Sequence, residues 1–267
     1  MQTVNYSHAN ALEQNALAHE DTVISCRYEL KYRIPEVKAR AVAKYIMAYI
    51  NPDRYSIKCK DYAYPVSSLY FDRENLQLCN ETIQGKKNRF KLRIRCYDDD
   101  VDTLCFFEIK RRINDVIHKD RARLSKKLLQ IAVHENYMHA SLCKREQDTL
   151  KQFQFYLQIL RARPIVLVRY MRQAFEENAV NRVRLTFDRQ LSFKAVDQTE
   201  ITLNGAGWQA VPIDFVILEI KFTSKYPLWL SRMVKIFDLN QSAMSKYVSS
   251  VKQFCSLGFC APKCLVR

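Results

Sequence analysis

Lysine and arginine recur at every second position between residues 89 and 95. Phe90, Leu92 and Ile94 stand between them. Successive side chains of a β-strand point to opposite faces, so the segment predicts a strand with one cationic and one apolar face. Arginine makes bidentate contacts to phosphate oxygens, and lysine acts as a point charge. The spacing therefore predicts a row of phosphate-binding side chains, formed by Arg89, Lys91, Arg93 and Arg95.

The same alternation returns in other short segments. They contain Lys31, Lys110, Lys119, Arg121, Arg172, Arg184 and Lys221. On any single strand, a charged face could simply lie in water. Ordinary solvent faces mix both signs, however, and here only Glu29, Glu108 and Glu219 provide contrast. The repetition favours an α+β fold in which a sheet closes into a barrel, with charged faces inward and helices over the apolar faces.

A barrel lined by like charges needs an anionic partner, because buried charge must be paired. A slim, densely charged ligand such as triphosphate or polyphosphate fits this need. An isolated carboxylate among bases is better suited to a divalent metal than to phosphate, which it repels. The isolated glutamates on these faces are therefore candidate ligands for Mn²⁺ or Mg²⁺.

Apolar spacing and turn residues predict the elements that carry these side chains. Strands are expected at about 26–34, 67–71, 89–95, 107–112, 119–124, 165–172, 183–187 and 216–222, with a helical turn at 73–79. Helices are expected at about 36–50, in two pieces within 125–161, and at 226–238 and 242–254. We expect residues 1–22 to form a mobile tail, 23–254 one domain, and 255–267 a second tail.

Composition narrows the classes of function. The formal charge is +15, and residues 1–25 contain three acids and no base, so the remainder is still more basic and favours a polyanionic partner. Four glycines exclude a glycine-rich phosphate loop or a dinucleotide fingerprint. Nine cysteines without a CxxC pair predict reduced thiols in a cytoplasmic chain, and Cys255, Cys260 and Cys264 lack the spacing of a zinc site. We find neither a signal peptide nor a membrane span.

Nine motifs, in order, resemble the VTC-type polyphosphate polymerase domain of the CYTH-like triphosphate tunnel metalloenzymes. They are RYELKYRI (27–34), YPVSSLYFD (64–72), GKKNRFKLRIRCY (85–97), FFEIKRR (106–112), KDRARLS (119–125), RYMRQAF (169–175), VRLTFD (183–188), ILEIKF (217–222) and MSKYV (244–248). The resemblance covers about residues 26–250.

This resemblance implies an eight-stranded antiparallel tunnel in which the γ-phosphate of ATP passes to a growing polyphosphate chain and ADP leaves. It implies that Glu219 holds Mn²⁺ or Mg²⁺ and that Arg93, Arg95 and Lys110 grip the β- and γ-phosphates of ATP. The full set of implied phosphate-binding residues is Lys31, Arg93, Arg95, Lys110, Arg121, Arg172, Arg184, Lys221 and Lys246. Lys119 is an alternative to Arg121 at its position.

The chain departs from the family pattern at two positions. Arg27 replaces the first glutamate of the ExExK motif common in tunnel enzymes, which lowers the number of metal carboxylates and is closer to the polymerase branch. Ala243 stands where a second lysine often precedes Lys246, which predicts a weaker grip on the product chain. Without a membrane segment in this sequence, any translocation would need a membrane protein on another chain.

Three other functions use similar features. A tunnel hydrolase would use the same lining on triphosphate or polyphosphate, and a non-catalytic module would only bind polyphosphate. A nucleic-acid binder would stack bases on aromatic rings, but the aromatic residues here alternate with the basic ones and fall on the opposite face. No Ser-His-Asp or Cys-His set points to a covalent mechanism, and the five histidines are expected at the surface.

Overall fold

The computed structural model describes residues 28–114, 116–135, 137–177, 183–223, 226–260 and 265. The tail expected at residues 1–22 lies outside the described residues. So does most of the segment after residue 260, including Cys264.

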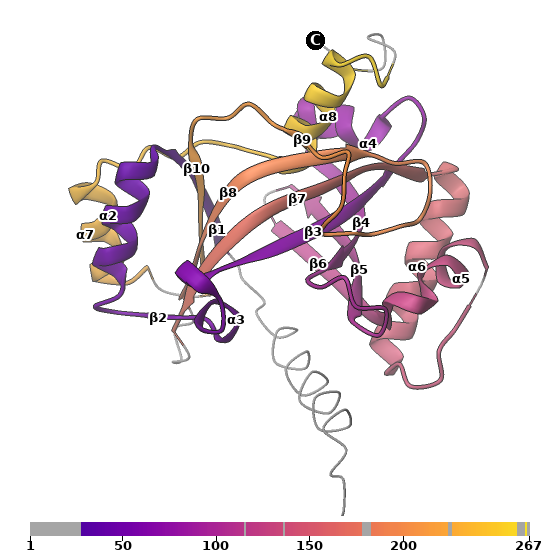
Figure 1. The fold of residues 1–267 in the computed structure, drawn as a ribbon, viewed down its shortest axis with the longest axis horizontal. Coiled ribbons are helices and arrows are strands. Elements are labelled where there is room, and N and C mark those ends of the chain that lie inside the picture. Colours follow the sequence, from indigo (N-terminus) through magenta and orange to yellow (C-terminus); the bar gives the residue numbers. More distant parts are fainter. Residues whose placement is uncertain are drawn as a thin grey trace, which may run out of the picture.

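An antiparallel sheet of eight main strands forms the centre of the molecule (Figure 1). In spatial order the strands are β1 (Tyr28–Ile34), β10 (Val216–Phe222), β8 (Val183–Ala195), β7 (Arg163–Glu176), β3 (Ala63–Asp72), β4 (Asn88–Cys96), β5 (Leu104–Ile113) and β6 (Val116–Ser125). The two-residue strands β2 (Asn51–Pro52) and β9 (Gln209–Ala210) pair with β7 and β8. The predicted α+β class, strand number and antiparallel order are confirmed.

The sheet curls, but its backbone ladder stays open between β1 and β6 among the described residues. Side chains cross the interior instead: Glu29 on β1 lies 3.0 Å from the Lys110 ammonium on β5. We call the face that these two side chains share the inner face. A fully closed barrel was expected, so this opening is a difference from the sequence prediction, and long charged side chains bridge it.

Two pairs of helices cover the outer face of the sheet, as predicted. Helices α2 (Glu36–Ile46) and α7 (Leu228–Ile236) pack on β1, β10 and β8. Helices α5 (Leu129–His134) and α6 (Lys144–Leu160) cover β4, β5 and β6 on the other side (Figure 1). Both contacts follow from spacing: Ala39, Val42 and Ile46 make one buried stripe on α2, and Leu150, Phe153 and Leu157 make one on α6.

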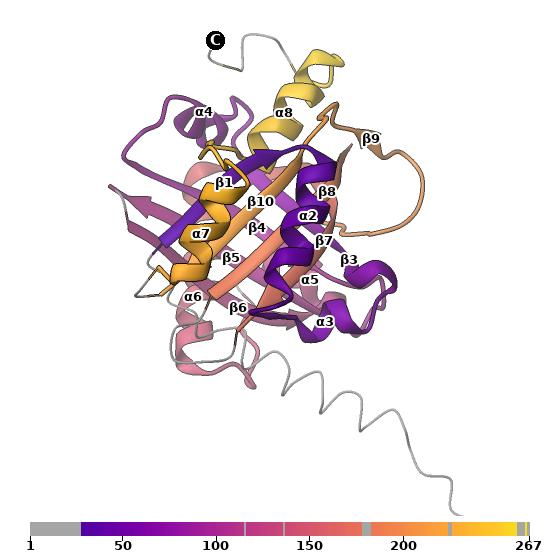
Figure 2. The ribbon, with the colours of Figure 1, turned by 90° about the vertical axis from the view of Figure 1, so that its left-hand side faces the viewer.

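Helix α8 (Lys246–Ser256) lies at one end of the barrel, beside α4 (Gln77–Ile83) (Figure 2). Its residues Tyr247, Val251 and Phe254 pack in a core with Val168 and Phe193, which belong to β7 and β8. Part of the sheet is therefore buried by helices on both faces. The short helix α3 (Arg54–Ile57) precedes β3, and its first-turn cap is the Asp53 carboxylate, which accepts from the Ser56 N–H at 2.8 Å.

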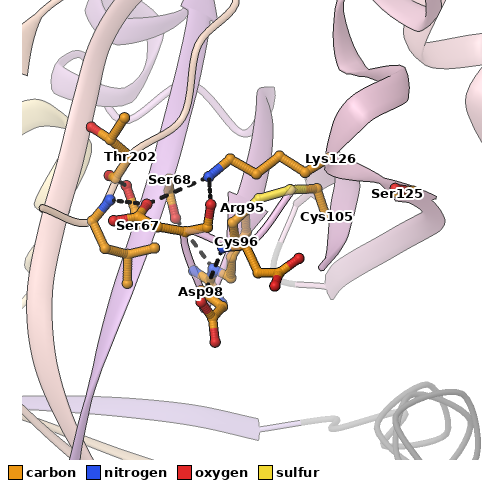
Figure 3. Close-up of a disulfide and its surroundings, with 12 residues drawn as sticks. Ser67, Ser68, Arg95, Cys96, Asp98, Cys105, Ser125, Lys126 and Thr202 are labelled. Atoms are coloured by element: carbon orange, nitrogen blue, oxygen red, sulfur yellow. Dashed lines mark hydrogen bonds and ion pairs between the residues drawn. A yellow bond between two sulfur atoms is a disulfide. The ribbon is translucent and has the colours of Figure 1, made fainter. Parts of the chain in front are cut away.

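The cysteines differ from the prediction of reduced thiols. Cys96 and Cys105 form a disulfide on the outer face of β4 and β5, and Cys255, in the last turn of α8, is joined to Cys260. The β4–β5 register explains the first bond, because it places Cys96 opposite Cys105 with Cα atoms 4.7 Å apart. Arg95, the neighbour of Cys96, points to Ser68 on the inner face (Figure 3). Cys59, Cys79 and Cys143 are free thiols.

Candidate functional site

The inner face gathers lysines and arginines from α8 and from seven of the eight main strands, all but β3. Strand register and the contacts below place eleven cations there: Lys31, Lys91, Arg93, Arg95, Lys110, Lys119, Arg121, Arg172, Arg184, Lys221 and Lys246. Five carboxylates share the face: Glu29, Glu108, Asp188, Glu219 and, at its edge, Glu176. All ten predicted site residues are therefore brought together. The cations remain in excess of the acids.

Glu108 is the centre of one group of cations. Its carboxylate has no exposed surface and lies 2.6 Å from Arg93, 2.8 Å from Lys119 and 2.7 Å from Arg121. Burial raises the pKa of the Glu108 carboxyl, but these cations outweigh burial and hold it well below its usual range. Glu108 is therefore ionised and fixes the three cations. Both candidates for the β6 position, Lys119 and Arg121, contact it.

Asp188 holds a second group. It accepts a bidentate pair from Arg172 at 2.7 and 2.8 Å, and it lies 2.6 Å from Lys246 at the start of α8. Burial raises the pKa of Asp188, yet Arg172 and Lys246 lower it to about 2. The Lys246 ammonium also stands over the Tyr170 ring, 4.9 Å from its centroid. The aspartate of the VRLTFD segment thus orients two predicted site residues.

A third group lies where β1 and β10 pair. Glu29 contacts Lys31 at 2.9 Å and Lys110 at 3.0 Å, and Glu219 contacts Lys221 at 2.8 Å. Burial and the neighbouring Glu219 raise the pKa of Glu29, but the surrounding lysines bring it to about 2. The two glutamates are diagonal neighbours, because Glu29 pairs with Lys221 and Lys31 pairs with Glu219.

Two cations of the inner face have no carboxylate partner among the described residues. Arg95 is 6% exposed and donates to the Ser68 and Tyr170 hydroxyls, each at 3.2 Å. Lys91 donates to Ser245 Oγ at 2.8 Å, and burial together with Lys31 and Lys110 holds its pKa well below the usual value. These two are the cations best able to accept new anionic ligands.

Arg184 faces the inside from the first residues of β8, but acids and a hydroxyl surround it. Its guanidinium lies 2.6 Å from Glu176 and 2.7 Å from Asp53, with the Tyr64 hydroxyl at 3.5 Å. The structure thus places Arg184 at the edge of the cationic face, where two carboxylates surround its single positive charge.

Sequence reasoning missed several contributors. Lys91 was part of the predicted cationic row but was given no role of its own. Tyr70, which accepts from Arg93 at 3.1 Å and stacks on Tyr247 at 4.5 Å, looked like one more strand aromatic. In the sequence, only its position two residues after Ser68 in β3 indicated that Tyr70 lies on the inner face.

A comparison with family models decides the relationship. The VTC domain model matches residues 26–255. The chain belongs to the VTC domain family. It shares the tunnel fold of that family, so the inner face is the lining of the tunnel. In the part of the chain that the structure describes, no helix combines the length and hydropathy needed to span a membrane.

Similar solved structures are distant. A protein of Bacillus halodurans proposed to be an adenylate cyclase is 12% identical, with 83% of this chain and 94% of that chain covered and a TM-score of 0.47. A Pyrococcus horikoshii protein is 9% identical, with 85% of this chain and 99% of that chain covered and a TM-score of 0.41. A third structure is a Hippeastrum protein described as an adenylyl cyclase candidate with a dominant triphosphatase activity. It is 13% identical, with 88% of this chain and 97% of that chain covered and a TM-score of 0.43. No curated protein sequence matches the chain.

Proposed function

We propose that this VTC domain is a polyphosphate polymerase that transfers the γ-phosphate of ATP to a growing polyphosphate chain and releases ADP. The observation that carries the proposal is the excess of cations over carboxylates on the tunnel lining of a VTC-family chain. An enclosed cationic lining requires a ligand with many negative charges, and a chain of phosphates has one at every unit.

The contacts support a division of labour along the tunnel. Arg93, Arg95 and Lys110 lie on the adjacent strands β4 and β5, where they would hold the β- and γ-phosphates together. Arg172 and Lys246, both oriented by Asp188, would hold the acceptor chain. Phosphoryl transfer passes through a loose transition state with charge spread over the oxygens, so fixed cations supply most of the catalysis. The acceptor is itself an oxyanion, and no general base is required.

The residues present fit a divalent metal. Glu219 offers a buried carboxylate and Glu29 a half-buried one on the neighbouring strand, and the described residues hold no cluster of three or more acidic, histidine or cysteine side chains. Magnesium and manganese are usually held by one or two carboxylates with phosphate oxygens completing the shell, which this pair allows. A bound metal would neutralise phosphate charge. Glu219, with Glu29 beside it, would hold it.

The test is product identity. The protein is incubated with ATP and Mn²⁺, and ADP and acid-insoluble polyphosphate are measured together. A polymerase yields one ADP for each phosphate incorporated, whereas release of free phosphate without chains would support the hydrolase. Binding without turnover would support the non-catalytic module. Arg93→Ala should cost on the order of 2–4 kcal/mol of transition-state stabilisation, comparable to the loss of one strong oxyanion donor.

Glu219→Gln separates metal binding from phosphate binding. The amide keeps the size of the side chain but removes a carboxylate, so Mn²⁺-dependent turnover should be lost while metal-free affinity for tripolyphosphate is kept. The matched control is Glu135→Gln, which changes an exposed residue. Wild-type turnover of Glu219→Gln across Mn²⁺ concentrations would transfer the metal-binding role to Glu29 or Glu108.

A further inference from the structure

One hydroxyl of the tunnel lining has no hydrogen-bond partner among the described residues. Thr186 lies in β8, two positions from Arg184 and two from Asp188, so the three side chains share the inner face. Only 2% of Thr186 is exposed, and its Oγ1 atom is buried and unpaired. Burying a hydroxyl without a partner costs free energy, so its presence in a folded protein needs an explanation.

The neighbours of Thr186 on the inner face do not supply that partner. Strand register places Glu219 of β10 on one side of Thr186 and Ala174 of β7 on the other. The Ala174 methyl group has no polar atom. Asp188 holds the two cations described above, and Glu219 contacts Lys221 at 2.8 Å. The hydroxyl therefore remains available to a ligand in the tunnel.

Thr186 and Glu219 bring two kinds of oxygen together. Residues directly opposite each other on antiparallel strands have Cβ atoms about 4.5–5.5 Å apart, so the hydroxyl and the carboxylate face the same small volume. Magnesium and manganese ions take oxygen ligands, and a threonine hydroxyl can join carboxylate and phosphate oxygens around them. The described residues hold no cluster of three carboxylate, imidazole or thiol side chains. A third protein ligand beside Glu219 and Glu29 therefore has to be of another kind.

We propose that the Thr186 hydroxyl is a ligand of the divalent metal ion that Glu219 holds in the tunnel. The inference rests on the proposed function for the metal and the phosphates, and it adds a neutral oxygen on the β8 side of the site. A neutral ligand binds the metal without adding negative charge that would repel phosphate. Because the same hydroxyl has no partner in the ligand-free protein, its removal should have opposite effects on stability and on metal binding.

Three substitutions in the full chain test this role. Thr186→Val replaces the hydroxyl by a methyl group of similar size, whereas Thr186→Ser keeps the hydroxyl. The matched control is Thr202→Val, because Thr202 Oγ1 is also buried without a partner among the described residues. The Thr202 carbonyl accepts from Ser67, which alternates with the inward-facing Ser68 in β3, so the control lies on the other side of the sheet from the metal site.

The metal is measured through its effect on phosphate binding, without turnover. Tripolyphosphate affinity is determined by calorimetry with EDTA and again with saturating Mn²⁺, and the ratio of the two affinities, the Mn²⁺ ratio, reports the metal site. We expect Thr186→Val to reduce the Mn²⁺ ratio about tenfold, equivalent to about 1.4 kcal/mol, at unchanged metal-free affinity. Thr186→Ser should keep most of the ratio, and Thr202→Val should keep all of it.

Thermal unfolding of the ligand-free protein gives an independent readout. Thr186→Val should raise the melting temperature by roughly 2–4 °C, because it removes a buried hydroxyl that has no partner. A hydroxyl that is bonded within the folded protein would instead lower the melting temperature when it is removed. The higher melting temperature also reports that the variant is folded.

Several outcomes would overturn the assignment. An unchanged Mn²⁺ ratio in Thr186→Val, or a wild-type ratio of one, would exclude the hydroxyl as a metal ligand. An equal loss of metal-free affinity would mean that Thr186 contacts phosphate, and an equal change in Thr202→Val would make the effect a general one of hydroxyl removal. The proposed function fails separately: if ATP yields no chains while the selective loss of the Mn²⁺ ratio remains, the polymerase is refuted and Thr186 stays a metal ligand.

Discussion

At the scale of single residues, each carboxylate of the tunnel lining holds cations in place for an anionic ligand. Glu108 shows this most clearly, since its fully buried side chain contacts Arg93, Lys119 and Arg121. A neutral residue there would leave three cations with less compensation. The lining is therefore preorganised by its own acids, and phosphate binding adds to contacts that already exist.

Glu108→Gln should destabilise the ligand-free protein by about 3–5 kcal/mol, the usual cost of removing one partner from a buried ion pair. Tripolyphosphate should restore more stability to this variant than to wild type, because the anion supplies the missing negative charge. Urea unfolding with and without tripolyphosphate measures both effects. Glu74→Gln, which removes an exposed partner of Arg163, serves as control and should change stability by less than about 1 kcal/mol. An equal response to the ligand in wild type and Glu108→Gln would refute this role.

Lys110 makes phosphate binding sensitive to pH. Burial lowers its pKa to about 8, with Glu29 and Glu219 opposing the shift and Lys31 and Lys221 adding to it. Tripolyphosphate affinity should therefore fall as pH rises from 7 to 9. In the wild-type protein without ligand, the free energy of unfolding should rise from about pH 8 towards pH 10.5. In this range Lys110 binds a proton more readily in the unfolded chain than in the folded one.

The matched variant for this prediction is Lys110→Arg, which stays charged over the whole range. Its affinity should decline less steeply between pH 7 and 9, as measured by calorimetry at constant ionic strength. The titration of tripolyphosphate itself is common to both proteins and cancels in the comparison. Identical pH profiles would rule out Lys110 as the titrating group.

At the scale of elements, alternation was sufficient to predict the strands and their two faces. Each lysine or arginine of β4 and β5 lies on the face that the sequence assigned to it, because a period of two leaves one choice of face once the apolar side is buried. Boundaries were less well defined: α2 ends at Ile46 rather than near residue 50, and β3 begins at Ala63 rather than Ser67.

Sequence reasoning did not foresee that α8 covers β7 and β8 at one end of the barrel. The evidence lay in β7, where Pro164 to Val168 form an unbroken apolar run and are buried throughout. Such a run indicates a strand covered on both faces, although periodicity alone does not identify what covers the second face. The disulfide partners were equally hidden, since pairing Cys96 with Cys105 requires the register of β4 and β5.

Tyr247 fastens α8 to the barrel, because its hydroxyl donates to Asp72 at 2.7 Å in a buried site. Tyr247→Phe should lower the free energy of unfolding by about 2 kcal/mol, typical of a lost hydrogen bond to a charged group. Because Ser245 and Lys246 begin the same helix, tripolyphosphate affinity should fall as well. Tyr62→Phe, at an exposed position, is the control for urea unfolding and calorimetry. Unchanged stability in Tyr247→Phe would show that apolar packing alone holds α8.

At the scale of the whole molecule, the formal charge of +15 and the surplus of cations on the tunnel lining act together. Repulsion inside the ligand-free tunnel opposes the compact state, and salt screens its exposed part. Raising NaCl from 20 to 500 mM should therefore raise the melting temperature of the ligand-free protein. Over this range the Debye length falls from roughly 20 to roughly 4 Å, so the salt screens the repulsion more strongly.

Tripolyphosphate should have the opposite dependence on salt. A ligand that binds only the folded state stabilises it by mass action, and binding to a cationic lining weakens as ions compete. The rise in melting temperature caused by a fixed ligand concentration should thus be several degrees at 20 mM NaCl and much smaller at 500 mM. Thermal unfolding with adenosine as an uncharged control distinguishes phosphate binding from nucleoside binding. A ligand effect that does not shrink with salt would contradict an electrostatic tunnel and require contacts that are mainly apolar.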